Sequence, residues 1–218
     1  MYSLLIFDWD GTLIDSEAKI ISSMQAAAQD VAWPQALSAE AVRSIIGLGL
    51  PEAIRTLCPG IEDTQAQALR ERYGVHFLEL NTQPMPMFAQ VAEGLPALKA
   101  AGYQLAVATG KSRRGLNRGL QETQTQDLFT CTRCADETRS KPHPQMLHEI
   151  LDELQVPVQQ ALMIGDTEFD LAMAQSIQMP RLGVTYGAHP QERLQACEPV
   201  ALLDTFAEVL QWLLQHKN

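Results

Sequence analysis

Two aspartates separated by one residue follow a short apolar segment at the start of the chain. They belong to the run Asp8-Trp9-Asp10-Gly11-Thr12, which comes directly after residues 3–7. If strand geometry persists, the side chains at positions 8 and 10 point the same way, and Gly11 lets the backbone turn sharply behind them. One carboxylate can then attack while the other transfers a proton. Two solvated aspartates at a strand end are the alternative.

Two further polar groups follow later apolar segments. The run Thr109-Gly110-Lys111-Ser112 offers a hydroxyl and free backbone N–H groups at a helix start, which suits a phosphate. A simple N-cap would also explain that run. Lys141, next to Pro142, can act as a point charge against phosphate, or it can be a solvated surface lysine.

A second acidic cluster follows the apolar residues 161–164. Asp166 and Asp170 are four residues apart, so they share one face if a helix begins near position 167. Asp166 is a candidate metal ligand, and helix capping is the alternative. Several carboxylates at one place repel each other and need a cation, and Mg²⁺ prefers hard oxygen ligands of this kind.

A regular framework must bring these groups together. Along most of the chain, short apolar runs alternate with amphipathic stretches. That alternation predicts an α/β fold whose parallel sheet is covered on both faces. In such a sheet, ligands bind outside the carboxyl ends of the strands, where all four polar groups are expected. Predicted strands span residues 3–7, 104–108, 128–134, 161–164 and 181–184, and predicted helices span residues 91–101, 114–122, 145–154, 169–176 and 206–215.

One stretch interrupts this alternation with helical patterns alone. Glycine and proline residues punctuate it, and it contains no convincing strand. We therefore expect an inserted helical domain at residues 15–82, with the α/β core formed by residues 1–14 and 83–218. The helices expected in the insertion span residues 18–28, 39–46, 52–57 and 65–79.

The charge and the apolar runs of the chain limit which kinds of molecule it is expected to bind. Lys and Arg total 16 against 26 Asp and Glu, so the formal net charge is −10. This charge disfavours nucleic acid and anionic membranes as partners. No apolar run approaches the roughly 20 residues of a membrane span, and the N-terminus lacks the basic start of a signal peptide. We expect a cytoplasmic protein, either a monomer or a homodimer.

Cysteine usage adds one motif, the C-x-x-C pair Cys131 and Cys134. A structural zinc site would need a second such pair, which the chain lacks. The pair also falls in a predicted strand and not at a helix start, where a thioredoxin-like motif would lie. Buried free thiols are therefore the favoured interpretation, over redox or metal use.

Taken together, the four polar groups resemble the four motifs of the haloacid dehalogenase superfamily, in order and in spacing. Asp8-Trp9-Asp10-Gly11-Thr12 looks like the first motif, Thr109 the second, Lys141 the third, and Asp166 with Asp170 the fourth. The branch that it resembles contains phosphoglycolate phosphatases and β-phosphoglucomutases. The resemblance implies a Rossmann-like three-layer core with a parallel sheet and an inserted α-helical cap.

The resemblance also implies roles for the core residues. Asp8 would attack phosphorus and form an aspartyl-phosphate, and Asp10 would act as general acid and then general base. Thr109 would hold the phosphoryl oxygens, and Lys141 would balance charge.

By the same resemblance, Mg²⁺ would be held by Asp8, the carbonyl of Asp10 and Asp166, with Asp170 in support. The implied substrate is a small phosphomonoester, phosphoglycolate-like or a sugar or nucleotide phosphate. A phosphomutase and a non-catalytic phosphate-binding protein are the alternatives.

Substrate contacts are expected from Gly110 and Lys111 in the core and from Arg43 in the cap. Further cap candidates are Glu17, Lys19 and residues 47–50.

Overall fold

The computed structural model describes residues 2–217 and contains one parallel sheet of six strands. The strand order is β3-β2-β1-β4-β5-β6, so β1 is central, between β2 and β4. The predicted α/β fold with a parallel sheet is confirmed. The strands are β1 (Leu4–Phe7), β2 (Gln104–Thr109), β3 (Cys131–Cys134), β4 (Ala161–Gly165), β5 (Arg181–Val184) and β6 (Ala201–Leu203).

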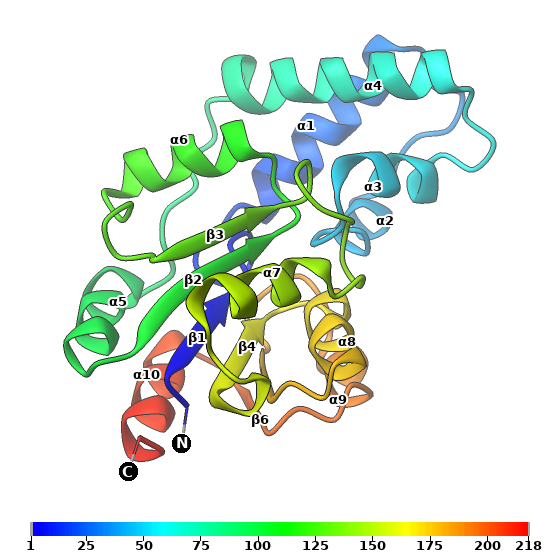
Figure 1. Ribbon diagram of the computed structural model, residues 1–218. Helices are drawn as coiled ribbons and strands as arrows, with labels where there is room; N and C mark the ends of the chain where they lie inside the picture. The colour runs from blue at the N-terminus through cyan, green and yellow to red at the C-terminus, as the bar shows by residue number, and fades with distance from the viewer. Residues whose placement is uncertain (1, 218) are drawn as a thin grey trace.

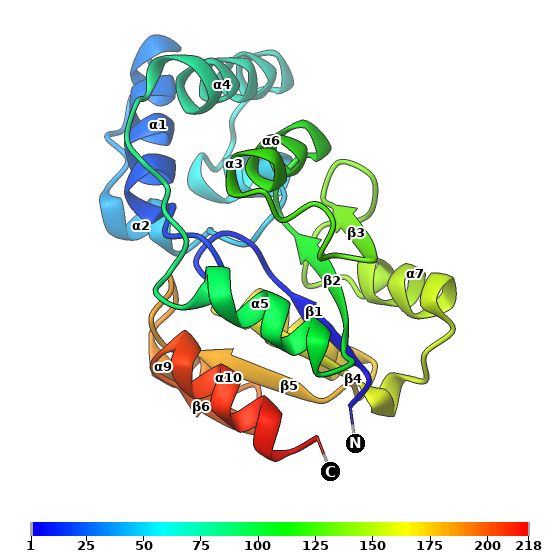
Figure 2. The ribbon, with the colours of Figure 1, turned by 90° about the vertical axis from the view of Figure 1, so that its left-hand side faces the viewer.

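Helices cover the sheet on both faces, because the central strand β1 carries apolar side chains on both of its faces. Its four residues are all fully buried. Leu5 and Phe7 pack in one hydrophobic cluster with helices α5 (Val91–Ala100), α6 (Arg113–Thr123) and α10 (Phe206–Gln215). Leu4 and Ile6 pack in another with α7 (Gln145–Leu154) and α8 (Glu168–Ser176). Alternate side chains of a strand point to opposite faces, so a continuous apolar run suits a strand buried on both sides. Figure 2 shows α5 and α10 side by side on one face.

The helices of this core lie close to the predicted ranges. Two short helices, η2 and α9, and the edge strand β6 were not predicted. The core helices are α5 (Val91–Ala100), α6 (Arg113–Thr123), α7 (Gln145–Leu154), η2 (Val158–Gln160), α8 (Glu168–Ser176), α9 (Gln191–Gln195) and α10 (Phe206–Gln215).

The segment between β1 and α5 is helical, as expected. Its helices gather at one end of the molecule, beyond the carboxyl ends of the strands (Figure 1). They surround a separate hydrophobic cluster that includes Met24, Ile54 and Leu69. A division of the chain into two domains at residues 14 and 82 stays a prediction. The helices are α1 (Glu17–Asp30), α2 (Ala39–Arg43), α3 (Leu50–Leu57), α4 (Asp63–Val75) and η1 (His76–Leu80).

The structure divides the helix that was predicted over residues 65–79. An α-helical part, α4, passes directly into η1, which has π-helical hydrogen bonding. π-Helical turns are rare and often lie at functional sites. In this chain η1 carries Phe77, which is buried, and Leu78.

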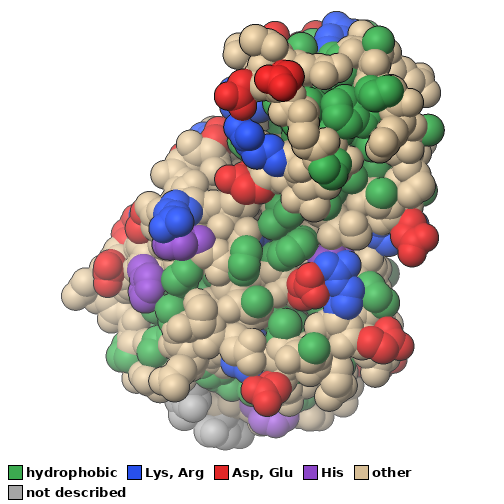
Figure 3. Space-filling model, turned by 90° about the vertical axis from the view of Figure 1, so that its right-hand side faces the viewer, with side chains coloured by type: hydrophobic (Ala, Val, Ile, Leu, Met, Phe, Trp, Pro, Cys, Tyr) green, Lys and Arg blue, Asp and Glu red, His purple; other side chains and the backbone are tan. Residues whose placement is uncertain are grey.

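None of the helices described between residues 2 and 217 combines the length and apolar character that crossing a membrane requires. On the face drawn in Figure 3, basic side chains lie beside acidic ones instead of forming a basic patch.

Candidate active site

The sheet brings three of the four polar groups to one edge. Asp8 follows β1, Thr109 ends β2 and Asp166 follows β4, and these three strands are neighbours in register. Asp8 still follows the strand pattern, because its N–H donates to the Ile164 carbonyl at 2.9 Å. The fourth group, Lys141, comes from the loop between β3 and α7. The four groups predicted at strand ends therefore converge.

A buried lysine joins two of the carboxylates. The Lys141 Nζ donates to Asp8 Oδ1 and to Asp170 Oδ1, each at 2.6 Å, and Lys141 is only 1% exposed. Burial alone would lower the pKa of Lys141, but the carboxylates of Asp170 and Asp8 outweigh it and raise that pKa. Lys141 is therefore a fixed positive charge beside Asp8, not a solvated surface lysine.

Asp8 has one oxygen with no partner. Its Oδ2 is buried and accepts no hydrogen bond among the described residues. A buried polar atom of this kind normally has a hydrogen-bond donor or a bound ion. Burial raises the pKa of Asp8 well above its ordinary value, against the lowering effect of Lys141. The site therefore disfavours the ionised form of Asp8 unless a further cation is present.

Two glycines and two hydrogen-bond donors closely surround the Asp166 side chain. Its Oδ1 accepts from the Thr12 hydroxyl at 2.7 Å, and its Oδ2 accepts from the Ala188 N–H at 2.8 Å. A Cβ on Gly11 would lie 2.2 Å from Asp166 Oδ2, and a Cβ on Gly187 would lie 2.2 Å from the Asp166 Cβ. The pKa of Asp166 is raised to about 7, mainly because the carboxyl is buried and secondly because Asp170 lies nearby.

These features fit a divalent cation. Asp8, Asp166 and Asp170 each offer a carboxylate oxygen, and these oxygens lie within 4.8 Å of one another. The oxygen donors, the unpartnered Asp8 Oδ2 and the unfavourable ionisation of two acids all call for positive charge at this point.

Asp170 is both a helix cap and a member of the site. Its Oδ1 binds Lys141, while its Oδ2 accepts from the Thr167 N–H at 3.1 Å and the Thr167 hydroxyl at 2.7 Å. The Thr167 hydroxyl in turn caps α8. Asp170 therefore takes part in capping α8 and also contacts Lys141, so both interpretations of this cluster from the sequence apply. Because both its oxygens are engaged, Asp170 positions Lys141.

Asp10 points into a pocket and is held by two residues. Its Oδ1 accepts from the Ser16 hydroxyl at 2.7 Å, and the Lys111 Nζ reaches Oδ1 at 2.9 Å and Oδ2 at 2.8 Å. Asp8, Asp10, Thr109 and Lys111 all line this pocket. Lys111 is thus paired with Asp10, a contact between residues 101 positions apart that the sequence did not indicate.

Thr109 and Gly110 complete the core side of the pocket. Thr109 is 1% exposed, and its hydroxyl accepts from the Lys111 N–H at 3.1 Å. Gly110 lies under the helical segment, because a Cβ at that position would lie 2.5 Å from the Gly47 carbonyl oxygen and 2.6 Å from that of Leu48. Glycine at position 110 therefore permits the loop 47–48 to cover the pocket.

Sequence comparison bears on this geometry. A family model for the haloacid dehalogenase-like hydrolases matches residues 5–184. The chain belongs to this family. The resemblance inferred from the four motifs is thus confirmed, whereas the roles of the individual site residues stay predictions.

Relatives of this hydrolase match over nearly the whole chain. It is 37% identical over 214 residues to "Probable phosphatase IndB" of Dickeya dadantii, covering 96% of this chain and 93% of that protein. It is 28% identical over 219 residues to a phosphoglycolate phosphatase of Vibrio vulnificus, covering 97% and 96%. A crystal structure described as a predicted phosphoglycolate phosphatase from Haemophilus somnus superposes with a TM-score of 0.84 at 28% identity, covering 96% and 97%.

Three of the cap candidates, Arg43, Glu17 and Lys19, lie outside the lining of this pocket. Arg43 donates from Nε and Nη2 to Glu17 Oε1 at 2.9 and 2.7 Å, and neither residue lines the pocket. Lys19 is buried with its Nζ 5.4 Å from the Phe77 ring centroid, also outside the pocket lining. Of the cap candidates, only the loop 47–50 contributes pocket residues, through Gly47, Leu48 and Leu50.

Several residues of the site were not predicted from the sequence. They belong to loops whose importance appears only when the chain folds. Ser16, Thr167 and the segment 186–188 hold Asp10, Asp170 and Asp166 respectively. His189 joins the core to the helical segment: its Nδ1 accepts from the Glu168 N–H at 3.1 Å, and its Nε2 contacts the Ser44 carbonyl at 3.2 Å.

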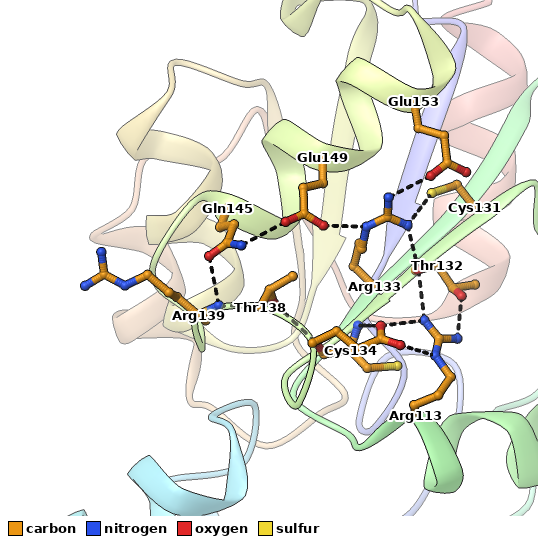
Figure 4. Close-up of polar contacts among 11 residues, drawn as sticks. Arg113, Cys131, Thr132, Arg133, Cys134, Thr138, Arg139, Gln145, Glu149 and Glu153 are labelled. Atoms are coloured by element: carbon orange, nitrogen blue, oxygen red, sulfur yellow. Dashed lines mark hydrogen bonds and ion pairs between the residues drawn. The ribbon is translucent and has the colours of Figure 1, made fainter.

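The cysteine pair is buried and unbridged, as predicted. Cys131 packs in the cluster on one face of the sheet and Cys134 in the cluster on the other. Burial raises the pKa of Cys131 to about 11 and that of Cys134 to about 12. Between them Arg133 binds Glu149 and Glu153 (Figure 4). The two thiols cannot meet in this strand and are poor nucleophiles.

Proposed function

We propose that this chain is a Mg²⁺-dependent phosphatase that hydrolyses a small phosphomonoester through an aspartyl-phosphate on Asp8. Its family and its relatives of matching length make it a phosphatase. The observation that supports the mechanism is the Asp8 carboxylate. Lys141 holds one of its oxygens, and the other is buried with no hydrogen-bond partner among residues 2–217, while Asp8 lines the pocket.

Asp8 is the proposed nucleophile. A carboxylate oxygen of Asp8 forms a bond to phosphorus while the bond from phosphorus to the alcohol oxygen breaks. Lys141 stays protonated because two carboxylates surround it. Its charge therefore compensates the negative charge that builds up between Asp8 and the phosphoryl group.

Asp10 is the proposed proton carrier. In its protonated form it gives a proton to the departing alcohol oxygen. As the carboxylate, it then takes a proton from the water that attacks phosphorus, so that the bond to Asp8 breaks and inorganic phosphate leaves. Ser16 and Lys111 hold the Asp10 side chain in the pocket for both steps.

Thr109 and Gly110 line the pocket beside Asp8, and we propose that the Thr109 hydroxyl and the Gly110 N–H bind the phosphoryl oxygens. Asp8, Asp166 and the Asp10 carbonyl would hold Mg²⁺, while Asp170 keeps Lys141 in place. When bound, the ion neutralises the carboxylates and the phosphoryl charge.

We propose that residues 15–82 form a cap over the core made of residues 1–14 and 83–218. The cap is seated by the Gly49 N–H, which donates to the Ser140 hydroxyl at 2.7 Å, and by the contact between His189 and the Ser44 carbonyl. Opening of these contacts would admit substrate, and closing would exclude bulk water from Asp8.

The proposal is tested by phosphate release from a panel of phosphomonoesters, with Mg²⁺ and with a chelator. We expect Mg²⁺-dependent turnover, and loss of turnover in Asp8→Asn because a neutral amide is a poor nucleophile. Asp152→Asn, an exposed position on α7, is the matched control and should keep full activity. Turnover by Asp8→Asn at the wild-type rate would contradict the covalent mechanism.

A further inference from the structure

The pocket above Asp8 has two unlike halves. The half from the core carries polar side chains, those of Asp8, Asp10, Thr109, Lys111 and Ser112. The half from the helical segment is apolar, with side chains from α1, from α3 and the loop before it, from α4 and from η1. These include Met24, Ile45, Leu50, Tyr73, Phe77 and Leu78. The phosphoryl group belongs to the polar half, so the leaving alcohol must occupy the apolar half.

Among the described residues, the apolar half contributes no cation to the pocket lining. Among residues 2–217, the one cation that lines the pocket is Lys111. Its Nζ lies 4.6 Å from the Phe77 ring centroid, but it is already paired with both oxygens of Asp10. Arg43 is bound to Glu17 outside the pocket, and Lys19 is also outside its lining. A carboxylate on the leaving group would therefore be buried without a partner, which is costly.

The apolar half also offers few hydrogen bonds. In the core half, the Ser112 hydroxyl caps α6 by accepting from the Gly115 N–H at 3.2 Å. The Tyr73 hydroxyl is the main polar group contributed by the helices. Its ring stacks on that of Phe77, with centroids 5.5 Å apart and an interplanar angle of 25°. The π-helical turn η1 continues α4 and places Phe77 and Leu78 in the pocket wall.

We propose that the leaving group of the substrate is an uncharged, largely apolar alcohol, alkyl or aryl, that packs against the stacked rings of Tyr73 and Phe77. This inference rests on the proposed phosphatase activity and specifies its substrate class. It sets this chain apart from a phosphatase for phosphoglycolate, whose leaving alcohol carries a carboxylate. It also disfavours a hexose phosphate, whose hydroxyls would lack partners in the apolar half.

Two esters of nearly the same shape test the inference. Isobutyl phosphate and phosphoglycolate differ in that an isopropyl group replaces a carboxylate, and their leaving alcohols are similar in size. We expect kcat/KM for isobutyl phosphate to exceed that for phosphoglycolate by about ten-fold or more, with benzyl phosphate better still. Equal values, or a preference for phosphoglycolate, would overturn the inference.

A pair of variants tests the role of the pocket wall. Leu78→Lys adds a cation to the apolar half and should shift the ratio at least about ten-fold toward phosphoglycolate. Leu80→Lys is the matched control, because Leu80 lies on the same turn but is 57% exposed and outside the pocket lining. It should keep the wild-type ratio. An unchanged ratio in folded Leu78→Lys would contradict the inference.

Failure of the inference can be told apart from failure of the proposed function. If wild-type protein releases no phosphate from any ester, including p-nitrophenyl phosphate, the phosphatase proposal fails. If it hydrolyses phosphoglycolate best, the phosphatase proposal stands and the apolar leaving group is wrong. The wild-type comparison decides this even if Leu78→Lys does not fold.

Discussion

Replacement of Asp166 by Asn should stabilise the metal-free protein. In the folded chain the pKa of Asp166 rises from its ordinary 3.8 to about 7, because the carboxyl is buried beside Asp170. The ionised form is therefore disfavoured in the folded state. Below about pH 4 the Asp166 carboxyl is protonated in both the folded and the unfolded chain and costs no stability. As the pH rises from about 4 through about 7, the folded protein loses stability relative to the unfolded chain.

The size of the effect follows from the same shift. Three pKa units, at about 1.4 kcal/mol each, amount to about 4 kcal/mol lost between about pH 4 and pH 7. Asn cannot ionise, so Asp166→Asn avoids this loss. Its amide can replace both hydrogen bonds of the Asp166 carboxylate: the oxygen can accept from the Ala188 N–H, and the NH₂ can donate to the Thr12 hydroxyl.

The assay is urea unfolding at pH 5 and pH 8, with a chelator and with Mg²⁺. At pH 8 in chelator, Asp166→Asn should be more stable than wild type by up to about 4 kcal/mol, and the gain should shrink at pH 5. Mg²⁺ should stabilise the wild type and have little effect on the variant.

Glu168→Gln is the matched control for this experiment. Glu168 lies two residues further along, and its ion pair with Arg193 is about one-third exposed on both sides. A pair of that kind contributes under about 1 kcal/mol, and the variant should respond to Mg²⁺ as the wild type does. If Asp166→Asn is less stable than wild type at pH 8 in chelator, or gains as much from Mg²⁺, the account of the carboxylate site is wrong.

Three further predictions concern the cap, the proton carrier and the thiols. In Gly110→Ala the new Cβ would lie 2.5 Å from the Gly47 carbonyl oxygen, where ordinary contact starts at 3.4 Å. The loop 47–48 must then move by about 0.9 Å, and kcat/KM should fall by up to about a hundred-fold; an unchanged value would mean that the loop need not close. Asp10→Asn should slow turnover by about 10²–10⁴-fold while leaving Mg²⁺ binding intact in a calorimetric titration, since general acid–base catalysis contributes that much; wild-type turnover would remove Asp10 from the mechanism. Native protein should not react with a thiol reagent at pH 8 through Cys131 or Cys134, since burial holds the pKa values near 11 and 12; rapid labelling of either thiol would contradict their burial.

The sequence predicted the part of the site that depends on strand ends. Asp8, Thr109 and Asp166 each follow a recognisable apolar strand, and parallel neighbours place such residues at one edge. Lys141 could be assigned only because it completed the set. By itself it looked like a surface lysine, yet it is almost fully buried.

The pocket wall could not be predicted in the same way. The pairing of Lys111 with Asp10 joins residues far apart in the sequence, and no local pattern encodes it. Arg43 suggested a substrate contact because of its charge, but a neighbouring helix supplies Glu17 as its partner. The apolar residues of α1 and η1 look like ordinary core positions, and only the packing of the helical segment over the core shows that some of them face a pocket. The edge strand β6 has three half-buried residues, too few for a clear pattern.

The central claim is that Asp8 carries the phosphoryl group during turnover. It is tested most directly by quenching the enzyme in mid-turnover, reducing it with borohydride and mapping its peptides by mass. Borohydride converts an aspartyl-phosphate to homoserine and leaves a free aspartate unchanged. The account predicts homoserine at position 8, only when substrate and Mg²⁺ are both present, and in greater amount in Asp10→Asn if breakdown of the intermediate is slowed more than its formation. Homoserine at another aspartate, or active turnover with Asp8 never modified, would contradict it.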